Sequence, residues 1–412
     1  MNRVEEINLS AIPVLILEEI FRDLPKSAPQ LHTMCIQSQS LSPGTTFSIH
    51  EDFLYDTERL RRVELINCKI GWDSKFLTGL TRLTLEDSLK TNSSIIEVFH
   101  ALQRMPALTD LRLKDSIPDN SEGPSTYPVV DLPYLRVLNI SSGVGPMTAV
   151  LRHINFPPSA ILNLTCNEKQ SAQIDFSKFL SVLATKVLST LVIRRLRLKA
   201  LSDYDSGSGL DGLKFYLWTT ELIQDCLPIR LFSQSQLQLV LTWPSSQLQN
   251  YVKVFTCVFD AMNLSFLTQL HITTWDYIDS QTWVKTFGRL PLLEGVCVHN
   301  DTQNPFFKAL VHKTKAAEES KTAYLDLSFP NLRYIHLERT TFSLVSSGGT
   351  SVDILLDCLM ERCERNAEVQ VLRLDDCYSI YSCDVERLKE IVVDVIWDGV
   401  EQEDEEEQCS EC

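Results

Sequence analysis

Glycine and proline are scarce in this sequence, with 14 glycines and 17 prolines among 412 residues. Fibrous and low-complexity proteins are rich in one or both, so the composition excludes those classes. Hydrophobic residues make up 44% of the chain and charged residues 22%, which is ordinary for a folded globular protein. We therefore expect a protein with a large buried core.

Long apolar runs and leader sequences are missing as well. No apolar run approaches the roughly 18 residues that suggest a membrane span. The first ten residues contain Glu5 and Glu6 and no basic segment followed by an apolar one, so we expect no secretory signal. The 12 cysteines are scattered singly, mostly beside apolar residues, which is typical of reduced, buried thiols. These features predict a cytoplasmic or nuclear protein with no membrane attachment.

Basic clusters are rare, and the formal net charge is −16. Seven acids lie in residues 401–412, and subtracting them leaves −9 for the first 400 residues. Because a nucleic-acid surface needs clustered Lys and Arg, we do not expect a nucleic-acid partner. The basic segment Arg194–Lys199 is either a contact for an acidic peptide or a solvated strand edge. Residues 399–412 are predicted to be an acidic disordered tail, with a dock for a basic partner as the alternative.

Motifs of catalysis are also lacking. The sequence has no phosphate loop, nucleophile elbow or dinucleotide fingerprint, and Gly207–Gly209 is typical of a flexible loop. Cys409 and Cys412 form a single C-x-x-C without the second pair that a zinc site needs. The residues between them are poor matches to a lipidation signal. The sequence therefore predicts a protein that is not an enzyme and has no cofactor or metal.

A repeat is what the sequence does contain. Residues Leu60–Ile70 read L-x-x-L-x-L-x-x-C-x-I, and Cys377 takes the position of Cys68 in a later copy. The L-x-x-L-x-L core, with Ile, Val or Met allowed, recurs with these first residues: Leu31, Leu60, Leu80, Leu108, Leu135, Leu188, Leu267, Leu293, Leu332 and Val369. Recurrence in one pattern indicates a repeat architecture.

Two gaps between copies span about two and three units, so they hide further repeats. Candidate strands in these gaps are Ile161–Thr165, Leu213–Trp218 and Leu237–Trp243, which gives about thirteen irregular repeats. Helical periodicity follows several cores, at Ile95–Arg104, Met147–Ile154, Ser246–Asp260, Val352–Arg365 and Val385–Ile396. Because a strand–helix unit cannot bury its apolar face alone, stacked units share one core. For residues 31–398 we predict an α/β leucine-rich-repeat solenoid, a horseshoe with a parallel concave sheet and outer helices.

The repeats at residues 58–72 and 80–85, the phrase Phe156–Ala160 before a strand, and the irregular units of about 27 residues resemble the repeat regions of fungal F-box proteins. The resemblance covers roughly residues 10–395 and depends on repeat style. In that family an N-terminal F-box docks on the adaptor subunit of a cullin-based ubiquitin ligase. The resemblance therefore implies that the horseshoe selects a target for ubiquitination.

Residues 1–30 have two interpretations. Residues 12–24 resemble the first F-box helix, and the resemblance nominates these adaptor-binding residues: Ile12, Pro13, Leu17, Ile20, Phe21 and Leu24. The second half departs from the family, because Leu31–Ile36 is already a repeat core and the turn-forming Ser42–Gly44 follows it. The segment is either a partial F-box or the helix of the first repeat, and periodicity, which explains both halves, favours the repeat helix.

Alternation along each strand predicts the partner-binding residues. Apolar residues three and five positions after the first leucine share a face and point to the core, so positions two, four and six point to the concave surface. These positions give Arg62, Glu64, Arg82, Glu86, Asp110, Arg112, Lys114, Arg194, His271, His299, Tyr334, His336, Glu338, Arg373 and Asp375. Both charges mixed with Tyr and His are typical of a protein-binding surface.

Three of these positions are histidines on consecutive repeats, His271, His299 and His336. A metal site or a pH switch is one interpretation. No cysteine or carboxylate is recognised at metal-ligand spacing beside them, which favours an ordinary polar binding surface. The predicted function is a monomeric protein-interaction module, either the substrate-recognition part of an F-box-type ubiquitin ligase or a free-standing scaffold without a ubiquitin link.

Overall fold

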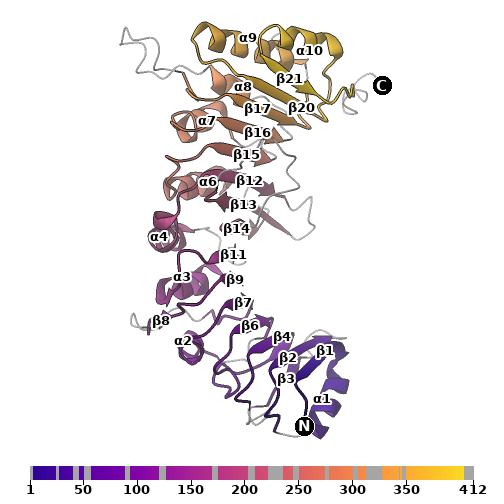
Figure 1. Ribbon diagram of the computed structural model, residues 1–412, viewed down its shortest axis with the longest axis vertical. Coiled ribbons are helices and arrows are strands. Elements are labelled where there is room, and N and C mark those ends of the chain that lie inside the picture. Colours follow the sequence, from indigo (N-terminus) through magenta and orange to yellow (C-terminus); the bar gives the residue numbers. More distant parts are fainter. Residues whose placement is uncertain are drawn as a thin grey trace. The chain divides into compact units, whose positions relative to one another are not determined.

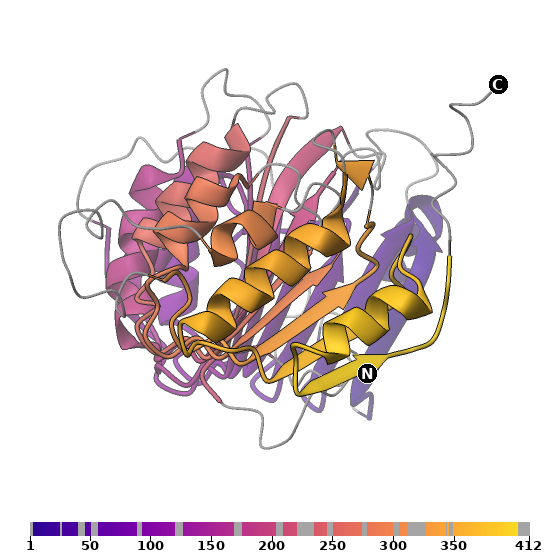
Figure 2. The same cartoon turned by 90° about the horizontal axis from the view of Figure 1, so that it is seen from above.

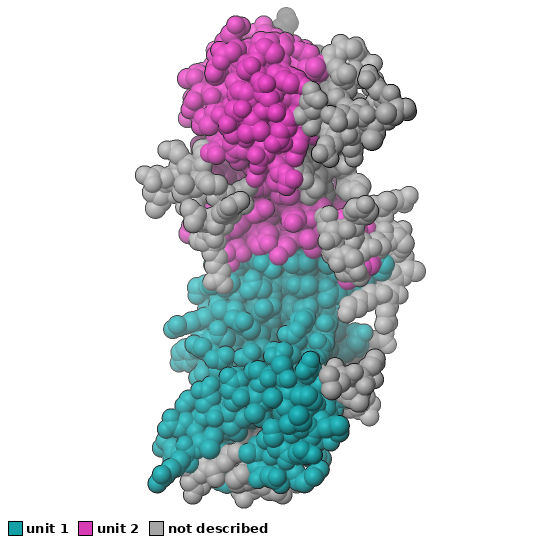
Figure 3. Space-filling model, turned by 90° about the vertical axis from the view of Figure 1, so that its right-hand side faces the viewer, with its two compact units in different colours: residues 1–190, 236–244 teal, residues 191–235, 245–412 magenta. Residues whose placement is uncertain are grey.

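The structure is a computed structural model that consists of two compact units (Figure 3). It describes residues 3–24, 27–39, 46–50, 57–88, 93–119, 127–168, 175–202, 209–220, 235–244, 250–273, 278–299, 305–311, 327–342, 344–345 and 349–402. Unit 1 comprises residues 1–190 and 236–244, and unit 2 comprises residues 191–235 and 245–412. The chain therefore leaves unit 1, returns to it for one short segment, and ends in unit 2.

Unit 1 contains eight strands of a sheet in which every neighbouring pair is parallel (Figure 1). In spatial order they are β1 (Glu6–Pro13), β2 (Thr33–Gln39), β4 (Arg62–Ile66), β6 (Arg82–Glu86), β7 (Asp110–Lys114), β9 (Val137–Ser142), β11 (Ile161–Asn167) and β14 (Leu237–Pro244). Two short parallel pairs join β3 (Phe47–Ser48) to β5 (Cys68–Lys69) and β8 (Val130–Asp131) to β10 (Ile154–Asn155). These eight strands follow chain order, but β12 and β13, which belong to unit 2, lie between β11 and β14 in the sequence.

The helices of unit 1 are α1 (Val14–Asp23), α2 (Ile95–Gln103), α3 (Val144–His153), α4 (Ser177–Lys186) and the 3₁₀ turn η1 (Leu188–Thr190). Helix α2 begins with a capping box, in which the Ser94 N–H donates to the Glu97 carboxylate at 3.3 Å. Helices α2, α3 and α4 lie on the same side of the sheet (Figures 1 and 2). The helices predicted at Ile95–Arg104 and Met147–Ile154 are confirmed to within three residues at each end.

Among its described residues, unit 2 contains seven strands of the large sheet, two strands of a separate pair and five helices. The strands in spatial order are β13 (Leu210–Trp218), β12 (Arg195–Leu201), β15 (Gln269–Thr273), β16 (Gly295–His299), β17 (Tyr334–Glu338), β20 (Val371–Asp375) and β21 (Asp394–Trp397). The helices are α6 (Asn250–Asp260), α7 (Ser280–Thr286), α8 (Pro305–Leu310), α9 (Ser351–Glu364) and α10 (Ser382–Lys389), and a small hairpin joins β18 (Leu344–Val345) to β19 (Gly349–Thr350). Neighbouring strands among the seven of the large sheet are parallel except β12–β13.

The predicted alternation of core and surface residues is confirmed in both units. Val63 is 1% exposed, Leu111 0% and Leu270 2%, and each lies on a parallel strand of its unit. Their neighbours along the chain point to the opposite face because successive side chains of a strand alternate. The apolar positions of the repeat therefore build the core, and the positions between them form a polar face.

A shared turn follows several strands. The first residue after the strand has a left-handed backbone at Asn67, Asp87, Asp115, Arg339 and Asp376, with φ between 45 and 55°. Asn and Asp adopt this conformation more readily than other residues with a side chain. The next residue then turns into the core, where Cys68, Ser88, Ser116, Thr340 and Cys377 are buried. The predicted equivalence of Cys68 and Cys377 is confirmed by this position.

One repeat core was predicted five residues too early. Leu188 begins η1, and the strand starts only at Arg195. The buried Ile193 occupies the place that the pattern gave to Leu188. Both starts satisfy L-x-x-L-x-L, since residues 188, 191 and 193 match it as well as residues 193, 196 and 198 do.

Two further predictions were only partly right. The strand predicted at Leu213–Trp218 exists as β13, but it pairs antiparallel to β12, so it is not another parallel repeat strand. The helix predicted at Val385–Ile396 ends at Lys389, and residues 394–397 form β21 beside β20. Alternating and helical apolar patterns overlap in so short a segment, and pairing with β20 decides between them.

Of the predicted tail, residues 399–402 are described. The Ser382 N–H donates to the Glu401 carboxylate at 2.8 Å, and the Ser379 N–H donates to the Gln402 carbonyl at 2.6 Å. Residues 403–412, Ser42–Gly44, and Gly207 and Ser208 of the predicted loop lie outside the described residues. Across the described part of the chain, no helix has the length and apolar character needed to cross a bilayer.

Candidate functional site

The seven concave-surface residues predicted for the N-terminal half lie together on β4, β6 and β7. We call this set the polar face of unit 1: Arg62, Glu64, Arg82, Glu86, Asp110, Arg112 and Lys114. Strand register aligns Arg62, Arg82 and Asp110 in one row. Glu86 and Lys114 are aligned in another. The structure therefore brings all seven residues onto one side of three neighbouring strands.

Ion pairs connect the polar face of unit 1. Arg62 Nη2 lies 2.9 Å from Glu64 Oε2, and Arg82 Nε lies 3.5 Å from Asp110 Oδ2. Lys114 pairs with Glu86, and the hydrogen bond raises the pKa of Lys114. Ion pairs exposed to this degree contribute at most about 1 kcal/mol each to the stability of the fold. The fold therefore does not depend on these charges. Both signs of charge remain accessible for binding.

In unit 2 the corresponding positions form two rows across β12, β15, β16, β17 and β20. One row contains Arg197, His271, Cys297, His336 and Arg373. The next contains Lys199, Thr273, His299, Glu338 and Asp375. Tyr334 begins β17 on the same face, with its ring centroid 6.4 Å from that of His336. Histidines and acids predicted separately are therefore direct neighbours.

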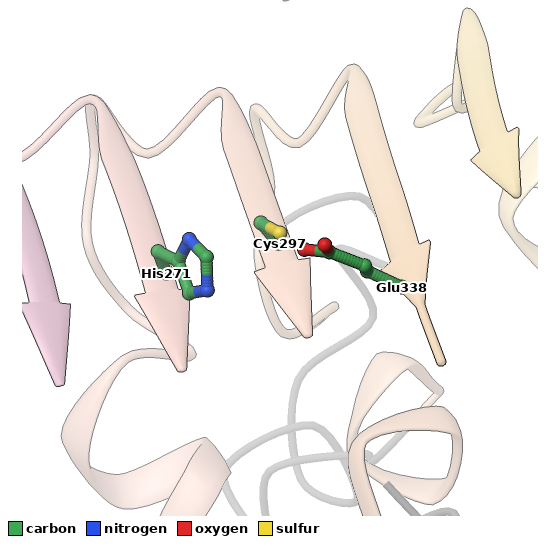
Figure 4. A group of neighbouring side chains, drawn as sticks. All are labelled: His271, Cys297 and Glu338. Carbon is green, nitrogen blue, oxygen red and sulfur yellow. The ribbon is translucent and has the colours of Figure 1, made fainter. Parts of the chain in front are cut away.

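The polar cluster of unit 2 consists of His271, Cys297, His299, His336 and Glu338. Within it, one donor atom from each of His271, Cys297 and Glu338 lies within 4.8 Å of the others. Figure 4 shows these three side chains on three adjacent strands, with the Glu338 carboxylate turned toward Cys297. The prediction that no cysteine or carboxylate accompanies the histidines is wrong, because the register of β15, β16 and β17 brings Cys297 and Glu338 next to His271.

Hydrogen bonds fix the groups around Cys297. Its Sγ lies 3.4 Å from His336 Nδ1, and His336 Nε2 lies 3.0 Å from Asp375 Oδ2. Arg373 Nε donates to the same Asp375 oxygen at 2.7 Å. At the other end of the cluster, His299 Nδ1 lies 3.2 Å from Glu338 Oε2. Cys297, His336, Asp375 and Arg373 thus form a connected chain across three strands.

Burial dominates the electrostatics of the polar cluster of unit 2. It lowers the pKa of His271 to about 3, and repulsion by Arg197 adds to this shift. Burial also lowers the pKa of His336 and raises the pKa of the Cys297 thiol. The hydrogen bond from His299 lowers the pKa of Glu338. Both shifted imidazoles are therefore neutral at physiological pH and have a ring nitrogen with a free electron pair.

Arg194 does not belong to this face. It precedes β12, its guanidinium lies 5.6 Å from the centre of the Phe266 ring, and Lys199 takes the position predicted for it. The error follows from the misplaced start at Leu188. The positional rule that selected His299 also selects Cys297, four residues after Leu293, so this signal was present in the sequence.

The residues nominated for adaptor binding are divided between β1 and α1. Ile12 and Pro13 end β1, which pairs with β2, and Leu17 is buried against the sheet. The Phe21 ring packs edge-on against Phe47, with 4.7 Å between the ring centres. Ile20 and Leu24 are partly exposed. The six residues therefore do not share one exposed surface.

A pocket of about 430 Å³ lies elsewhere in unit 1. Its lining consists of Ala107, Thr109, Pro133, Tyr134, Leu135, Arg136, Pro157 and Ser159. Arg136 is the charged residue of this lining, and Tyr134 is its aromatic residue.

No family model matches this sequence, and no curated protein matches it. A functional assignment therefore depends on the geometry of the polar face of unit 1 and of the polar cluster of unit 2.

Proposed function

We propose that this chain is a leucine-rich-repeat protein that binds a protein partner on the polar, concave face of a solenoid and performs no covalent chemistry. The polar face of unit 1 carries this proposal, because its charged residues stand in register on three parallel strands. Neighbouring strands lie about 4.8 Å apart, so the backbone fixes the spacing of these side chains before a partner arrives. A preformed surface costs little ordering entropy on binding.

The composition of this face suits a protein better than a lipid or a nucleic acid. Arg62, Arg82 and Arg112 stand beside acids on the same strands or on neighbouring ones. The acids of this face repel the uniformly negative phosphate backbone of a nucleic acid, although its arginines attract it. A folded protein can place charges of both signs opposite those of this face. We expect a few central arginines to provide most of the binding energy.

The chain's wider role is most simply that of a free-standing scaffold. Strand β1 pairs in parallel with β2, and α1 directly follows it with Leu17 buried, which is the strand–helix arrangement of the other repeats. Residues 6–24 then act as the first repeat. Nothing in such a scaffold requires a ubiquitin ligase.

Substrate recognition in an F-box-type ubiquitin ligase is the second candidate. The exposed apolar side chains Leu15 (74%) and Ile16 (47%) on α1 favour it, because an adaptor needs an apolar surface to dock on. The resemblance of the repeats to fungal F-box proteins points the same way. In this role α1 binds the adaptor while the polar face holds the target.

A pull-down from the native cell, followed by mass spectrometry, tests partner binding. The double variant Arg112→Glu/Lys114→Glu reverses two exposed charges on the polar face of unit 1. Arg152→Glu/Lys178→Glu, a control on α3 and α4, changes net charge equally at two exposed helix positions. We expect the first variant to lose the partner and the second to retain it. Retention by both would contradict binding on this face.

Co-purification with the cullin adaptor separates the two roles. Leu15→Glu/Ile16→Glu removes the exposed apolar pair from α1 without deleting β1 or α1. Val129→Glu, at another exposed apolar position of unit 1, serves as the control. Adaptor binding that only the α1 variant loses supports the ligase role, and no adaptor binding by the wild-type chain supports the scaffold.

A further inference from the structure

We propose that unit 2 binds a zinc ion, with His271, Cys297 and Glu338 as its ligands. The three residues come from the adjacent strands β15, β16 and β17 (Figure 4). Imidazole nitrogen, thiolate sulfur and carboxylate oxygen are the donor types that zinc takes in proteins. The site is separate from the partner-binding residues of unit 1.

The strand register places the ligands at suitable positions. His271 is the register partner of Cys297, and Cys297 is the register partner of His336, two residues before Glu338 on β17. Because alternate residues share a face, all three ligands project from the same side of the sheet. Zinc lies about 2.3 Å from sulfur and about 2.0–2.2 Å from nitrogen and oxygen, so tetrahedral ligand atoms are about 3.3–3.6 Å apart. The present separations, all within 4.8 Å, require only a short inward movement of side chains.

Outer groups hold these ligands in place. Cys297 Sγ contacts His336 Nδ1 at 3.4 Å, and Asp375 fixes the opposite nitrogen of that ring at 3.0 Å. His299 Nδ1 lies 3.2 Å from Glu338 Oε2, and Thr273 Oγ1 lies 3.1 Å from His271 Nε2. Metal ligands are commonly oriented by such secondary hydrogen bonds, and losing one typically weakens binding about 10–100-fold. Each proposed ligand therefore has a polar neighbour that limits its rotation.

The three ligands also determine which metal ion the site prefers and what the bound ion does to unit 2. A thiolate and an imidazole favour zinc over Mg²⁺ and Ca²⁺, which prefer oxygen ligands. The ion connects three consecutive strands, so its binding stabilises unit 2. Three protein ligands leave one tetrahedral position for water or another outside ligand.

Metal titration of the full-length chain, first stripped with a chelator, tests the site. We expect one high-affinity Zn²⁺ equivalent by calorimetry, and a Co²⁺ complex with a thiolate charge-transfer band. Cys297→Ser should abolish that band, whereas Cys383→Ser, at an exposed cysteine of the same unit, should retain it. Glu338→Gln should weaken Zn²⁺ binding at least about tenfold. Mg²⁺ should not compete.

Circular dichroism shows whether each variant folds. If Cys297→Ser does not fold, Glu338→Gln still tests the zinc site, because it preserves the size of the side chain. Failure of the wild-type chain to bind Zn²⁺, or wild-type affinity in the folded Glu338→Gln variant, overturns the proposal. Neither result affects the pull-down on the polar face of unit 1, so the metal site and partner binding can fail independently.

Discussion

Arg362 on α9 donates from Nη2 to the carbonyl oxygen of Phe329 at 2.8 Å, and from Nη1 to that of Ser328 at 2.9 Å. The arginine is 0% exposed, and burial lowers its pKa to about 10. Phe329 has a left-handed backbone, with φ of 57°, just before β17. The buried guanidinium therefore stabilises a strained turn and connects it to α9.

Replacing this arginine should destabilise unit 2. In Arg362→Met three buried carbonyl groups, those of Leu310, Ser328 and Phe329, lose their donor, which should lower the free energy of unfolding by about 2–4 kcal/mol. Urea denaturation followed by circular dichroism measures the change. The control Arg365→Met removes a partly exposed ion pair with Glu361 from the same helix and should cost less than about 1 kcal/mol. Equal losses of unfolding free energy in the two variants would show that the buried hydrogen bonds of Arg362 contribute no more stability than the ion pair of Arg365.

Adjacent residues of β7 should differ sharply in their effect on stability. Leu111→Ala leaves a cavity in the core and should cost about 2–5 kcal/mol. Arg112→Ala alters an exposed side chain and should stay within about 0.5 kcal/mol of the wild type. Thermal and urea unfolding of both variants provide the comparison. A larger loss for Arg112→Ala would contradict the assignment of the two faces.

The left-handed turn after β7 predicts an unusual order of substitutions at Asp115. Its backbone φ is 45°, and its N–H donates to the Ser141 carbonyl at 2.9 Å. Asp115→Gly should be nearly neutral because glycine adopts this conformation freely. Asp115→Val should cost about 1–3 kcal/mol, since a β-branched residue is strained there. Both variants lose the carboxylate, so that loss affects them equally. The urea midpoint of Asp115→Val should therefore lie clearly below that of Asp115→Gly.

Asp353 should contribute to stability in a pH-dependent way. The backbone N–H of Thr350 donates to its carboxylate at 2.9 Å, and Arg387 lies 2.8 Å away, which together lower its pKa from 3.8 to about 2. As the pH falls, the unfolded chain takes up this proton before the folded chain does. The stabilisation is thus complete above about pH 4 and is lost as the pH falls toward 2.

Asp353→Asn should accordingly lower the free energy of unfolding by about 0.3–1 kcal/mol at pH 6. The gap between variant and wild type should shrink as the pH approaches 2. Asp357→Asn, at an exposed position of the same helix, is the control. Urea midpoints measured at several pH values test this, and a gap that widens toward acid pH would rule out the assigned role.

The core residues of each unit could be predicted because side-chain alternation in a strand depends only on residues that are close in the sequence. Leu111 and Leu113 are two residues apart, and a strand necessarily places such residues on one face. The register of β12 could not be predicted, because two overlapping sets of apolar residues fit the repeat equally well. The orientation of β13 was missed for a related reason, since parallel and antiparallel strands have the same alternation.

The polar cluster of unit 2 was only half predictable. The positional rule found His271 and Glu338, but their proximity to Cys297 depends on the register between strands that are distant in sequence. Cysteine adds a further ambiguity, because it packs like a small apolar residue and also binds metals. Only the neighbours in space distinguish Cys297 from a core thiol such as Cys68.

Strand β14 enters unit 1 only after the chain has contributed β12 and β13 to unit 2. During synthesis the ribosome must therefore deliver residues up to 244 before the sheet of unit 1 can be completed. A recombinant fragment that stops at Thr190 lacks the strand that pairs with β11. The β11 edge of this fragment would expose unpaired backbone N–H and C=O groups, which can pair with a second copy of the fragment. In the full-length chain β14 covers this edge.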